Sequence, residues 1–594
     1  MSPIEQTTAV VPSEKTDAMN DQLPSHTVEE RLGSSSTEAS RKPEMQETVA
    51  HDAEKAPGSP VPDDDNEYPP PAAAAVVMIA IALAIFLVAL DRTIIATAIP
   101  KMTDDFHSLK DIGWYGSAFL LTACTFQLVL GRVYTFYPPK PVFLACIFLF
   151  EIGSAICGAA PSSTVFIVGR AIAGIGSAGV MSGAIVLMTN TIPLAKRPKY
   201  QGMFGAVFGV ASIAGPLLGG AFTSSKVTWR FCFYVNLPIG AIVLVIVAFI
   251  LKPIEPKRGD LTLKRKLALL DPLGNLFLTP SIVCLLLALQ WGGSTYAWSD
   301  KRIIALFVVF VVLFLAFVAV QIFRQDTAMI PAHIIKQRSI LAAMWWTFTL
   351  ASAMMLMIYY VPIWFQSIKG VSAVQSGIDT IPMVLSLVVG TIMGGFSTSK
   401  IGYYTPLAYA SAVIMPIGAA MISTWTPATG HSMWIGYQVL FGFGLGLGMQ
   451  QGNMAAQTVL SKTDVPSGIS LVFLTQMLGG AIFISVGQNI LQSELVKGLQ
   501  QYGIDPLVIV TTGATEIRNL VPAAQLPEVL IVYNYALRQT FLCAVGLAVL
   551  LRSALRAWSG RVSRRQRREA RRKRELLRRK GEARRVRPRE KAHN

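Results

Sequence analysis

The stretch Ala72–Pro100, AAAAVVMIAIALAIFLVALDRTIIATAIP, decides the fold class of this chain. As a helix that rises about 1.5 Å per residue, its apolar part is long enough to cross about 30 Å of hydrocarbon. Asp91 and Arg92 interrupt this apolar run near its end. Charged side chains inside a membrane span are costly, so they usually face a bundle interior or water and mark ion or proton pathways. The stretch therefore predicts a membrane helix that carries part of a functional site.

The composition extends this prediction to the whole chain. Of the 594 residues, 52% are hydrophobic and 15% are charged, whereas about a quarter of the residues in soluble domains are charged. The recurrence of apolar runs of about twenty residues predicts an all-α polytopic membrane protein. Fourteen spans are expected, at 74–99, 113–134, 141–160, 164–188, 202–222, 233–251, 273–291, 303–323, 340–365, 375–396, 404–424, 432–456, 467–490 and 537–555.

The two ends of the chain differ from the spans and from each other. Residues 1–71 are rich in Ser, Glu, Asp and Pro, which predicts an acidic disordered tail because such a segment buries too little apolar surface. Residues 556–594 form a basic tail, and from Arg552 onward there are 19 Lys and Arg against 4 Asp and Glu. Because Lys and Arg concentrate on the cytoplasmic side of membranes, both tails are expected in the cytoplasm. The basic tail is expected to bind anionic lipid headgroups or only to anchor the topology, and a protein partner or nucleic acid are the alternatives.

Asp91 and Arg170 are predicted to lie at a similar depth in the membrane. Asp91 is about 22 Å along the first span from its cytoplasmic start, and Arg170, in VGRAIAGIGSAGV, is about 9 Å from the outer start of the fourth span. The two side chains are thus placed to share one chamber in which Asp91 takes up and releases a proton. A purely structural ion pair is the alternative.

Small residues recur at helical spacing in the fifth span, GAVFGVASIAGPLLGGAF. They give one smooth face that permits close approach of another backbone, beside a proline that bends or loosens the helix. The pattern indicates either tight packing or contacts that slide and rock between bundles. The residues concerned are Gly205, Gly209, Gly215, Pro216, Gly219 and Gly220.

A faint internal repeat predicts the domain organisation. GRVYTFYPPK after the second span and GFSTSKIGYY after the tenth each begin with Gly and close hairpins of similar length. This correspondence places two inserted helices between six-helix halves. The predicted domains are an N-terminal six-helix bundle at 72–252, a linker with two inserted helices at 253–339, and a C-terminal six-helix bundle at 340–555 with an outer loop at 492–535.

Aromatic, Met and amide side chains within the spans are candidates for a substrate cavity. Aromatic and Met side chains suit varied apolar ligands, and amides form hydrogen bonds that orient a ligand. Packing between helices and contact with lipid are the alternatives for the same residues. The candidates are Gln127, Trp346, Met355, Tyr359, Gln451, Asn453 and Gln476.

Taken together, these motifs resemble the major facilitator superfamily, and specifically its fungal family of fourteen-span drug:proton antiporters. The resemblance is carried by LDRTIIATAIP in the first span, GRAIAGIGSAGV in the fourth, GVASIAGPLLGGAF in the fifth and WRFCFYVNLPIG at the entry to the sixth. It implies the major facilitator fold, with two six-helix bundles plus two inserted helices. It also implies proton coupling through Asp91 and Arg170, and conformational coupling through the glycines of the fifth span.

The loop after the second span departs from the family pattern. The superfamily usually carries an Asp four residues after the first Gly of this loop, and later a Gly followed by basic residues. Thr135, Pro138 and Pro139 occupy those places here, so only Gly131 and Lys140 are left as candidate gate residues.

The resemblance implies a proton-coupled efflux transporter that exports small amphipathic molecules, such as toxins, drugs or secondary metabolites, by alternating access. The proton gradient is then the energy source, without a cofactor or bound metal, and the partners are the substrate, protons and the bilayer. A monomer in the plasma membrane is expected, with the vacuolar membrane as the alternative. An importer or siderophore carrier on the same fold, or a membrane receptor or scaffold, are the other functional alternatives. The sequence contains no GxxxxGK[ST] loop, which disfavours an ATP-driven pump, and it shows no cluster typical of an enzyme.

Overall fold

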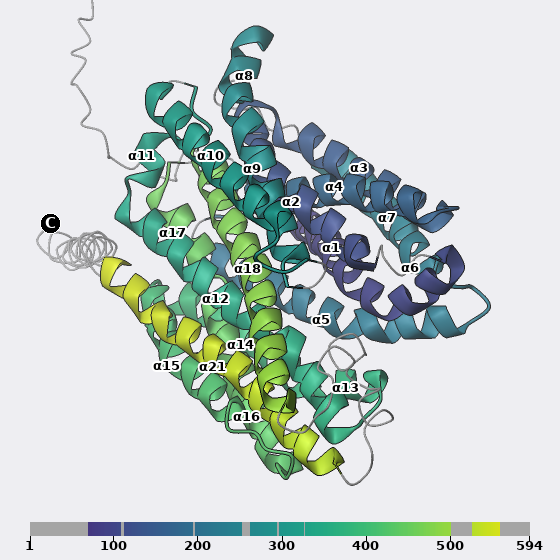
Figure 1. Ribbon diagram of the computed structural model, residues 1–594. Coiled ribbons are helices and arrows are strands. Elements are labelled where there is room, and N and C mark those ends of the chain that lie inside the picture. The colour runs from purple at the N-terminus through teal and green to yellow at the C-terminus, as the bar shows by residue number, and fades with distance from the viewer. Residues whose placement is uncertain are drawn as a thin grey trace, which may run out of the picture. The chain divides into compact units, whose positions relative to one another are not determined.

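The computed structural model describes residues 69–107, 112–193, 196–251, 262–293, 296–325, 327–461, 463–500 and 525–558. All of them belong to one of the two compact units of the chain, Val61–Asn594. The structure there is built from helices, which confirms the predicted all-α polytopic class (Figure 1). The helices are α1 Pro71–Phe106, α2 Ile112–Phe136, α3 Pro139–Ala159, α4 Ser163–Thr191, α5 Arg197–Ser224, α6 Phe231–Tyr234, α7 Asn236–Ile250, α8 Leu263–Leu269, α9 Pro272–Trp291, α10 Lys301–Phe323, α11 Ala332–Ile335, α12 Arg338–Trp364, the π-helix η4 Phe365–Lys369, α13 Ala373–Asp379, α14 Ile381–Ile401, α15 Thr405–Ile422, α16 His431–Gly448, α17 Gln451–Val459, α18 Val465–Gln500 and α21 Leu526–Trp558.

Thirteen helical segments in the described part of the chain are long and apolar enough to cross a membrane. The predicted span at 432–456 differs from them, because it forms two helices, α16 and α17, with an interruption at Met449–Gln450. Its alternating glycines lower the hydropathy but let α16 approach α14 and α15 closely. A Cβ atom on Gly444, for example, would lie 2.5 Å from the backbone nitrogen of Met415 on α15. The count of fourteen crossing helices stays a prediction.

The described helices pack mainly as two sets. In the first set, α1 packs on α5 and α7, and α4 packs on α2 and α3; in the second, α12 packs on α18 and α21, and α16 packs on α14 and α15. In Figure 1 the first set is purple to blue and the second is teal to yellow. The two sets meet where α5 packs on α14 and α2 packs on α18, and α9, paired with α10, contacts both α2 and α18. The predicted domain limits are not tested by these contacts and stay predictions. The tails at 1–71 and 556–594 lie almost entirely outside the described residues. Of the predicted outer loop at 492–535, residues 501–524 lie outside them, whereas α18 continues to Gln500 and α21 begins at Leu526.

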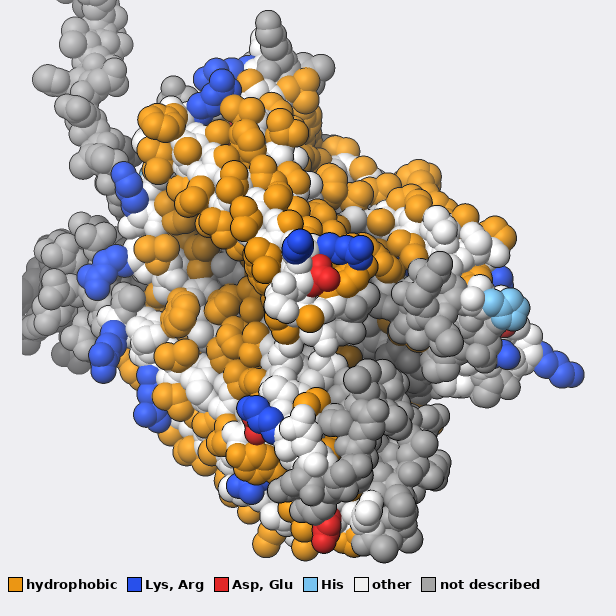
Figure 2. Space-filling view, viewed as in Figure 1, with side chains coloured by type: hydrophobic (Ala, Val, Ile, Leu, Met, Phe, Trp, Pro, Cys, Tyr) orange, Lys and Arg blue, Asp and Glu red, His pale blue; other side chains and the backbone are white. Residues whose placement is uncertain are grey.

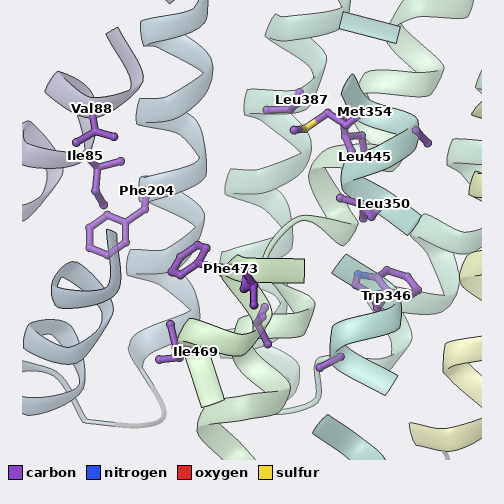
Figure 3. Close-up of a cluster of buried hydrophobic side chains, with 14 of the residues drawn as sticks. Ile85, Val88, Phe204, Trp346, Leu350, Met354, Leu387, Leu445, Ile469 and Phe473 are labelled. Atoms are coloured by element: carbon purple, nitrogen blue, oxygen red, sulfur yellow. The ribbon is translucent and has the colours of Figure 1, made fainter. Parts of the chain in front are cut away.

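The surface and the core are both apolar, as expected for a protein that is embedded in a lipid bilayer. Figure 2 shows hydrophobic side chains covering much of the visible face, with Lys and Arg in separate small groups. Helix α10 contributes Val312, Leu315 and Phe323 to the exposed apolar residues. Inside, one buried cluster includes side chains from both sets of helices, such as Ile85 of α1 and Met354 of α12 (Figure 3). The two sets therefore share a continuous core.

Candidate functional site

Asp91 and Arg170 form a buried ion pair between α1 and α4. The Arg170 Nη1 donates to Asp91 Oδ2 at 2.5 Å, and the exposed fractions of the two side chains are 1% and 0%. The Arg170 Nε donates to the Tyr115 carbonyl at 2.9 Å, and the guanidinium carbon lies 4.6 Å from the centre of the Phe119 ring. The two charges meet, as their depths along α1 and α4 predict, and their role in proton coupling stays a prediction.

A second carboxyl group, which the sequence analysis missed, lies near this pair. Glu151 on α3 is 7% exposed, and neither of its carboxyl oxygens has a hydrogen-bond partner among the described residues. It packs against the backbone of Gly240 on α7, where a Cβ atom would overlap the Glu151 carboxyl group. The nearby Asn236 amide makes long hydrogen bonds to Ser154 Oγ, at 3.3 Å, and to Asp91 Oδ1, at 3.5 Å. The only sequence signal was a single acidic residue inside an apolar run, FLFEIG.

A central cavity lies beside the ion pair and receives side chains from both sets of helices. The empty space in it, counted together with the open space at its mouth, is about 1040 Å³. Ile85, Phe204, Phe473 and Met354, labelled in Figure 3, belong to its wall. The lining residues are Ile85, Arg92, Leu120, Cys124, Met181, Ile185, Phe204, Gly205, Phe208, Ala351, Met354, Met355, Met449, Gln450, Asn453, Phe473, Gln476, Met477, Gly480, Ala481 and Ile484.

The charged residue that lines this cavity is Arg92, and not the ion pair itself. Asp91 points away from the cavity, toward α4, because successive side chains on a helix are about 100° apart. The sequence analysis identified Arg92 as an unusual residue but assigned the site to its neighbour. Asp91 and Arg92 thus belong to two adjacent environments, a closed ion pair and an accessible cavity.

Of the seven candidate cavity residues, Met355 on α12, Asn453 on α17 and Gln476 on α18 line the cavity. The Asn453 Nδ2 donates to Gln450 Oε1 at 3.4 Å. The residue is 4% exposed, and its Oδ1 has no hydrogen-bond partner among the residues that the structure describes. Asn453 thus lines the cavity, but its Oδ1 is itself buried.

Gln127 and Trp346 are buried in helix packing away from the cavity. The Gln127 Nε2 donates to Ser182 Oγ at 2.6 Å, which joins α2 to α4. The Trp346 indole donates to the Gly448 carbonyl at 3.0 Å, so it supports the end of α16. Their contacts correspond to the packing alternative that the sequence left open.

Tyr359 and Gln451 also lie outside the cavity lining. The Tyr359 side chain is 50% exposed and packs edge-on against Tyr360 at a ring distance of 5.2 Å. The Gln451 Nε2 donates to the Leu447 carbonyl at 2.7 Å and is buried. Its neighbour Gln450 faces the cavity instead.

The glycines of α5 place this helix against two neighbours. A Cβ atom on Gly205 or Gly209 would overlap side chains of α14, and one on Gly215 would overlap Thr93 on α1. One turn earlier, a Cβ atom on Gly202 would lie 2.8 Å from the Thr391 carbonyl oxygen of α14. These glycines therefore allow α5 to touch both its own set and the other one.

The end of the glycine motif is less crowded. Helix α5 continues without a break through Pro216, and Gly219 is buried. A Cβ atom on Gly220 would meet nothing within 4 Å. Only part of the motif thus makes close helix contacts in this conformation.

The two candidate gate residues have different surroundings. A Cβ atom on Gly131 of α2 would overlap Ser470 and lie 3.3 Å from the Pro466 carbonyl oxygen, both on α18. Lys140 donates to the carbonyls of Ala248 and Leu251, at 2.7 and 2.6 Å, at the end of α7. Gly131 therefore lies at a contact between the two sets of helices, and Lys140 caps a helix within the first set.

Comparisons with known proteins agree on one family. Residues 81–484 match the sequence profile of the Major Facilitator Superfamily. The chain is 54% identical over 473 residues to the MFS-type efflux pump MFS1 of Arthroderma benhamiae, which covers 79% of this chain and 88% of that protein. It is 50% identical over 474 residues to the efflux pump aflT of Aspergillus parasiticus, which covers 79% of this chain and 92% of that protein.

A solved structure supports the fold independently. The bacterial homologue of the human lysosomal transporter Spinster, in its inward-facing and unoccupied conformation, aligns with a TM-score of 0.51 at 18% identity. The alignment covers 82% of this chain and 98% of that chain. At this identity the likeness concerns the fold alone.

Proposed function

The chain belongs to the Major Facilitator Superfamily, a family of membrane transporters, and from this premise we propose that it is a proton-coupled efflux transporter. It exports small amphipathic molecules by alternating access of the central cavity. Relatives about half identical to it over most of their length are named efflux pumps, which supports the direction of transport. The observation that carries the proton coupling is the fully buried Asp91–Arg170 pair next to the cavity.

The coupling follows from the helices that the pair connects. An ionised Asp91 holds Arg170 and so ties α1 to α4, whereas a protonated Asp91 leaves the guanidinium without its counter-charge, which is unfavourable in a buried site. Helix α1 packs on α5, and α5 packs on α14 of the other set. Protonation of Asp91 can therefore change the contact between α5 and α14, which joins the two sets of helices. Substrate binding at the cavity, which α1 and α5 also line, acts on the same helices.

Glu151 adds a second proton-binding group to this proposal. An ionised carboxylate without a partner is strongly disfavoured in such a buried place, so Glu151 holds its proton in this conformation. Among the helices that pack on α3, helices α6 and α7 contain no Lys, Arg, Asp or Glu, α4 contains Arg170, and α2 contains Arg132. The Asp91–Arg170 pair, which Asn236 of α7 contacts, is the charged group that we expect a proton leaving Glu151 to meet.

A substitution at Glu151 tests this role. Glu151→Gln resembles the protonated carboxyl in shape, so we expect an unchanged melting temperature, and accumulation driven by a proton gradient should fall about a hundredfold or more, as for the loss of a proton-transfer group. Glu494→Gln, which removes a partly buried carboxylate that pairs with the exposed Lys497 on α18, is the matched control and should transport normally. Equal transport by wild type and Glu151→Gln would exclude Glu151 from the coupling.

The proposed function is tested directly in inverted membrane vesicles. A panel of radiolabelled amphipathic aromatic compounds is supplied outside, and the lumen is made acidic. At least one compound should accumulate in vesicles that contain the protein, and nigericin, which dissipates the proton gradient, should release it. Uptake that ignores the imposed gradient would contradict proton coupling.

The proposal also includes the oligomeric state, the membrane and the orientation of the protein. We place it as a monomer in the plasma membrane, with both tails in the cytoplasm and the basic tail on anionic lipid. The transport cycle needs no catalytic step and no cofactor, since the proton gradient supplies the energy.

A further inference from the structure

The central cavity combines an apolar wall with a single cation. Its lining includes five methionines and three phenylalanines, together with Gln450, Asn453 and Gln476, and Arg92 is the only charged residue that the described part of the chain contributes to it. Methionine and aromatic side chains favour flat, polarisable ligands. A guanidinium stays charged at any relevant pH and offers a planar set of donors that matches a carboxylate. The cavity is therefore electrostatically positive although it is mostly apolar.

No acidic side chain in the described part of the chain forms an ion pair with Arg92. Asp91, its sequence neighbour, is occupied by Arg170. Within the described part of the chain, the structure gives the Arg92 side chain no ion pair or hydrogen bond, and Arg92 is one of the residues that line the cavity. An unpaired cation within a membrane span is costly, so a ligand that brings a negative charge to this point removes an existing penalty.

A second polar feature lies on the opposite set of helices. The buried Asn453 Oδ1 on α17 is an acceptor without a partner among the described residues, while Arg92 belongs to α1. Both residues line the same cavity, so a ligand that pairs with Arg92 would also lie against residues of the other set of helices.

We propose that the cavity binds aromatic, largely apolar molecules that carry one carboxylate or phenolate, and that Arg92 pairs with this anionic group. This assignment rests on the proposed transport function and specifies its substrate class. Arg92 is then a residue that determines specificity, distinct from the proton-coupling pair.

The test measures binding without any proton gradient. Purified full-length protein in lipid nanodiscs is titrated at pH 7.5 with tritiated 2-naphthoate and, separately, with its methyl ester, which has nearly the same apolar surface but no charge. Hydrogen bonds to charged groups support a preference of about tenfold or more for the carboxylate. Arg92→Gln should abolish this preference while leaving binding of the ester nearly unchanged, and Arg92→Lys should retain part of it.

The control is Lys101→Gln, which removes an exposed positive charge from the same helix outside the cavity and should keep the full preference. Because Arg92 has no partner among the described residues, Arg92→Gln should melt at the temperature of the wild type or higher, so lost binding cannot be attributed to unfolding. Equal binding of acid and ester by the wild type, or an intact preference in Arg92→Gln, would overturn the proposal. The vesicle assay separates the two conclusions, since uptake that ignores the gradient would refute proton coupling while the Arg92-dependent preference stood.

Discussion

Replacing Arg170 with alanine is expected to abolish proton-driven accumulation and to lower the free energy of unfolding by about 3–5 kcal/mol. The reason is that Asp91 would remain fully buried without its counter-charge, and breaking a buried ion pair by removing one partner costs about this much. Asp91→Asn should abolish accumulation as well, because the amide cannot exchange a proton. Accumulation in vesicles and denaturant unfolding in detergent measure the two effects.

The double variant Asp91→Asn with Arg170→Gln separates stability from coupling. With both charges removed, no unpaired charge is left in the core, so most of the lost stability should return. Transport should stay absent, since the proton-binding group is gone. Arg324→Ala, at an exposed arginine that caps the end of α10, is the control and should change neither quantity. Proton-driven accumulation by Asp91→Asn would show that the pair is only structural.

Valine at Gly202 is expected to reduce transport at least about tenfold. A Cβ atom there would lie 2.8 Å from the Thr391 carbonyl oxygen and 3.1 Å from the Cα of Gly395, and backbone atoms cannot move aside as a flexible side chain can. Overpacking of this kind typically costs about 1–3 kcal/mol. Here the cost falls on the contact between α5 and α14, so the conformation with this contact closed becomes less populated.

The same helix offers the matched control. Gly220→Val makes the same chemical change where a Cβ atom meets nothing within 4 Å, so transport per membrane-inserted protein should stay within about twofold of the wild type. Transport is measured against the amount of protein that reaches the membrane, and melting temperatures report any loss of fold. Normal transport by Gly202→Val, or equal losses in both variants, would show that the α5–α14 contact does not take part in the cycle.

The membrane helices could be predicted from the sequence because their signal is strong. An apolar run of about twenty residues has few alternative structures, and the depth of a residue along a span follows from a fixed rise. This is why the meeting of Asp91 and Arg170 could be anticipated. The span at 432–456 has the weaker hydropathy signal because glycines replace large apolar residues there. Close packing against neighbouring helices, rather than hydropathy, therefore determines where its helices lie.

The cavity could be predicted only in part because depth does not give direction around a helix. Gln450 and Gln451 are adjacent, yet only Gln450 lines the cavity, since the chain breaks between α16 and α17 at this point. The same holds for Asp91 and Arg92, which face different neighbours. Glu151 could not be identified from the sequence because its importance lies in a buried carboxyl group without a hydrogen-bond partner among the described residues. A sequence does not show which buried polar groups lack such partners.

The most direct test of the central claim, that the Asp91–Arg170 pair exchanges protons for substrate, is proton movement driven by substrate alone. Proteoliposomes with a pH-sensitive dye inside and no initial pH difference are loaded with the compound that accumulates fastest in the vesicle assay, and are then diluted into compound-free buffer. In the wild type, exit of the compound should draw protons in and acidify the lumen, and Asp91→Asn should show no acidification. Compound exit without any pH change in the wild type, or the same acidification in Asp91→Asn, would contradict the account.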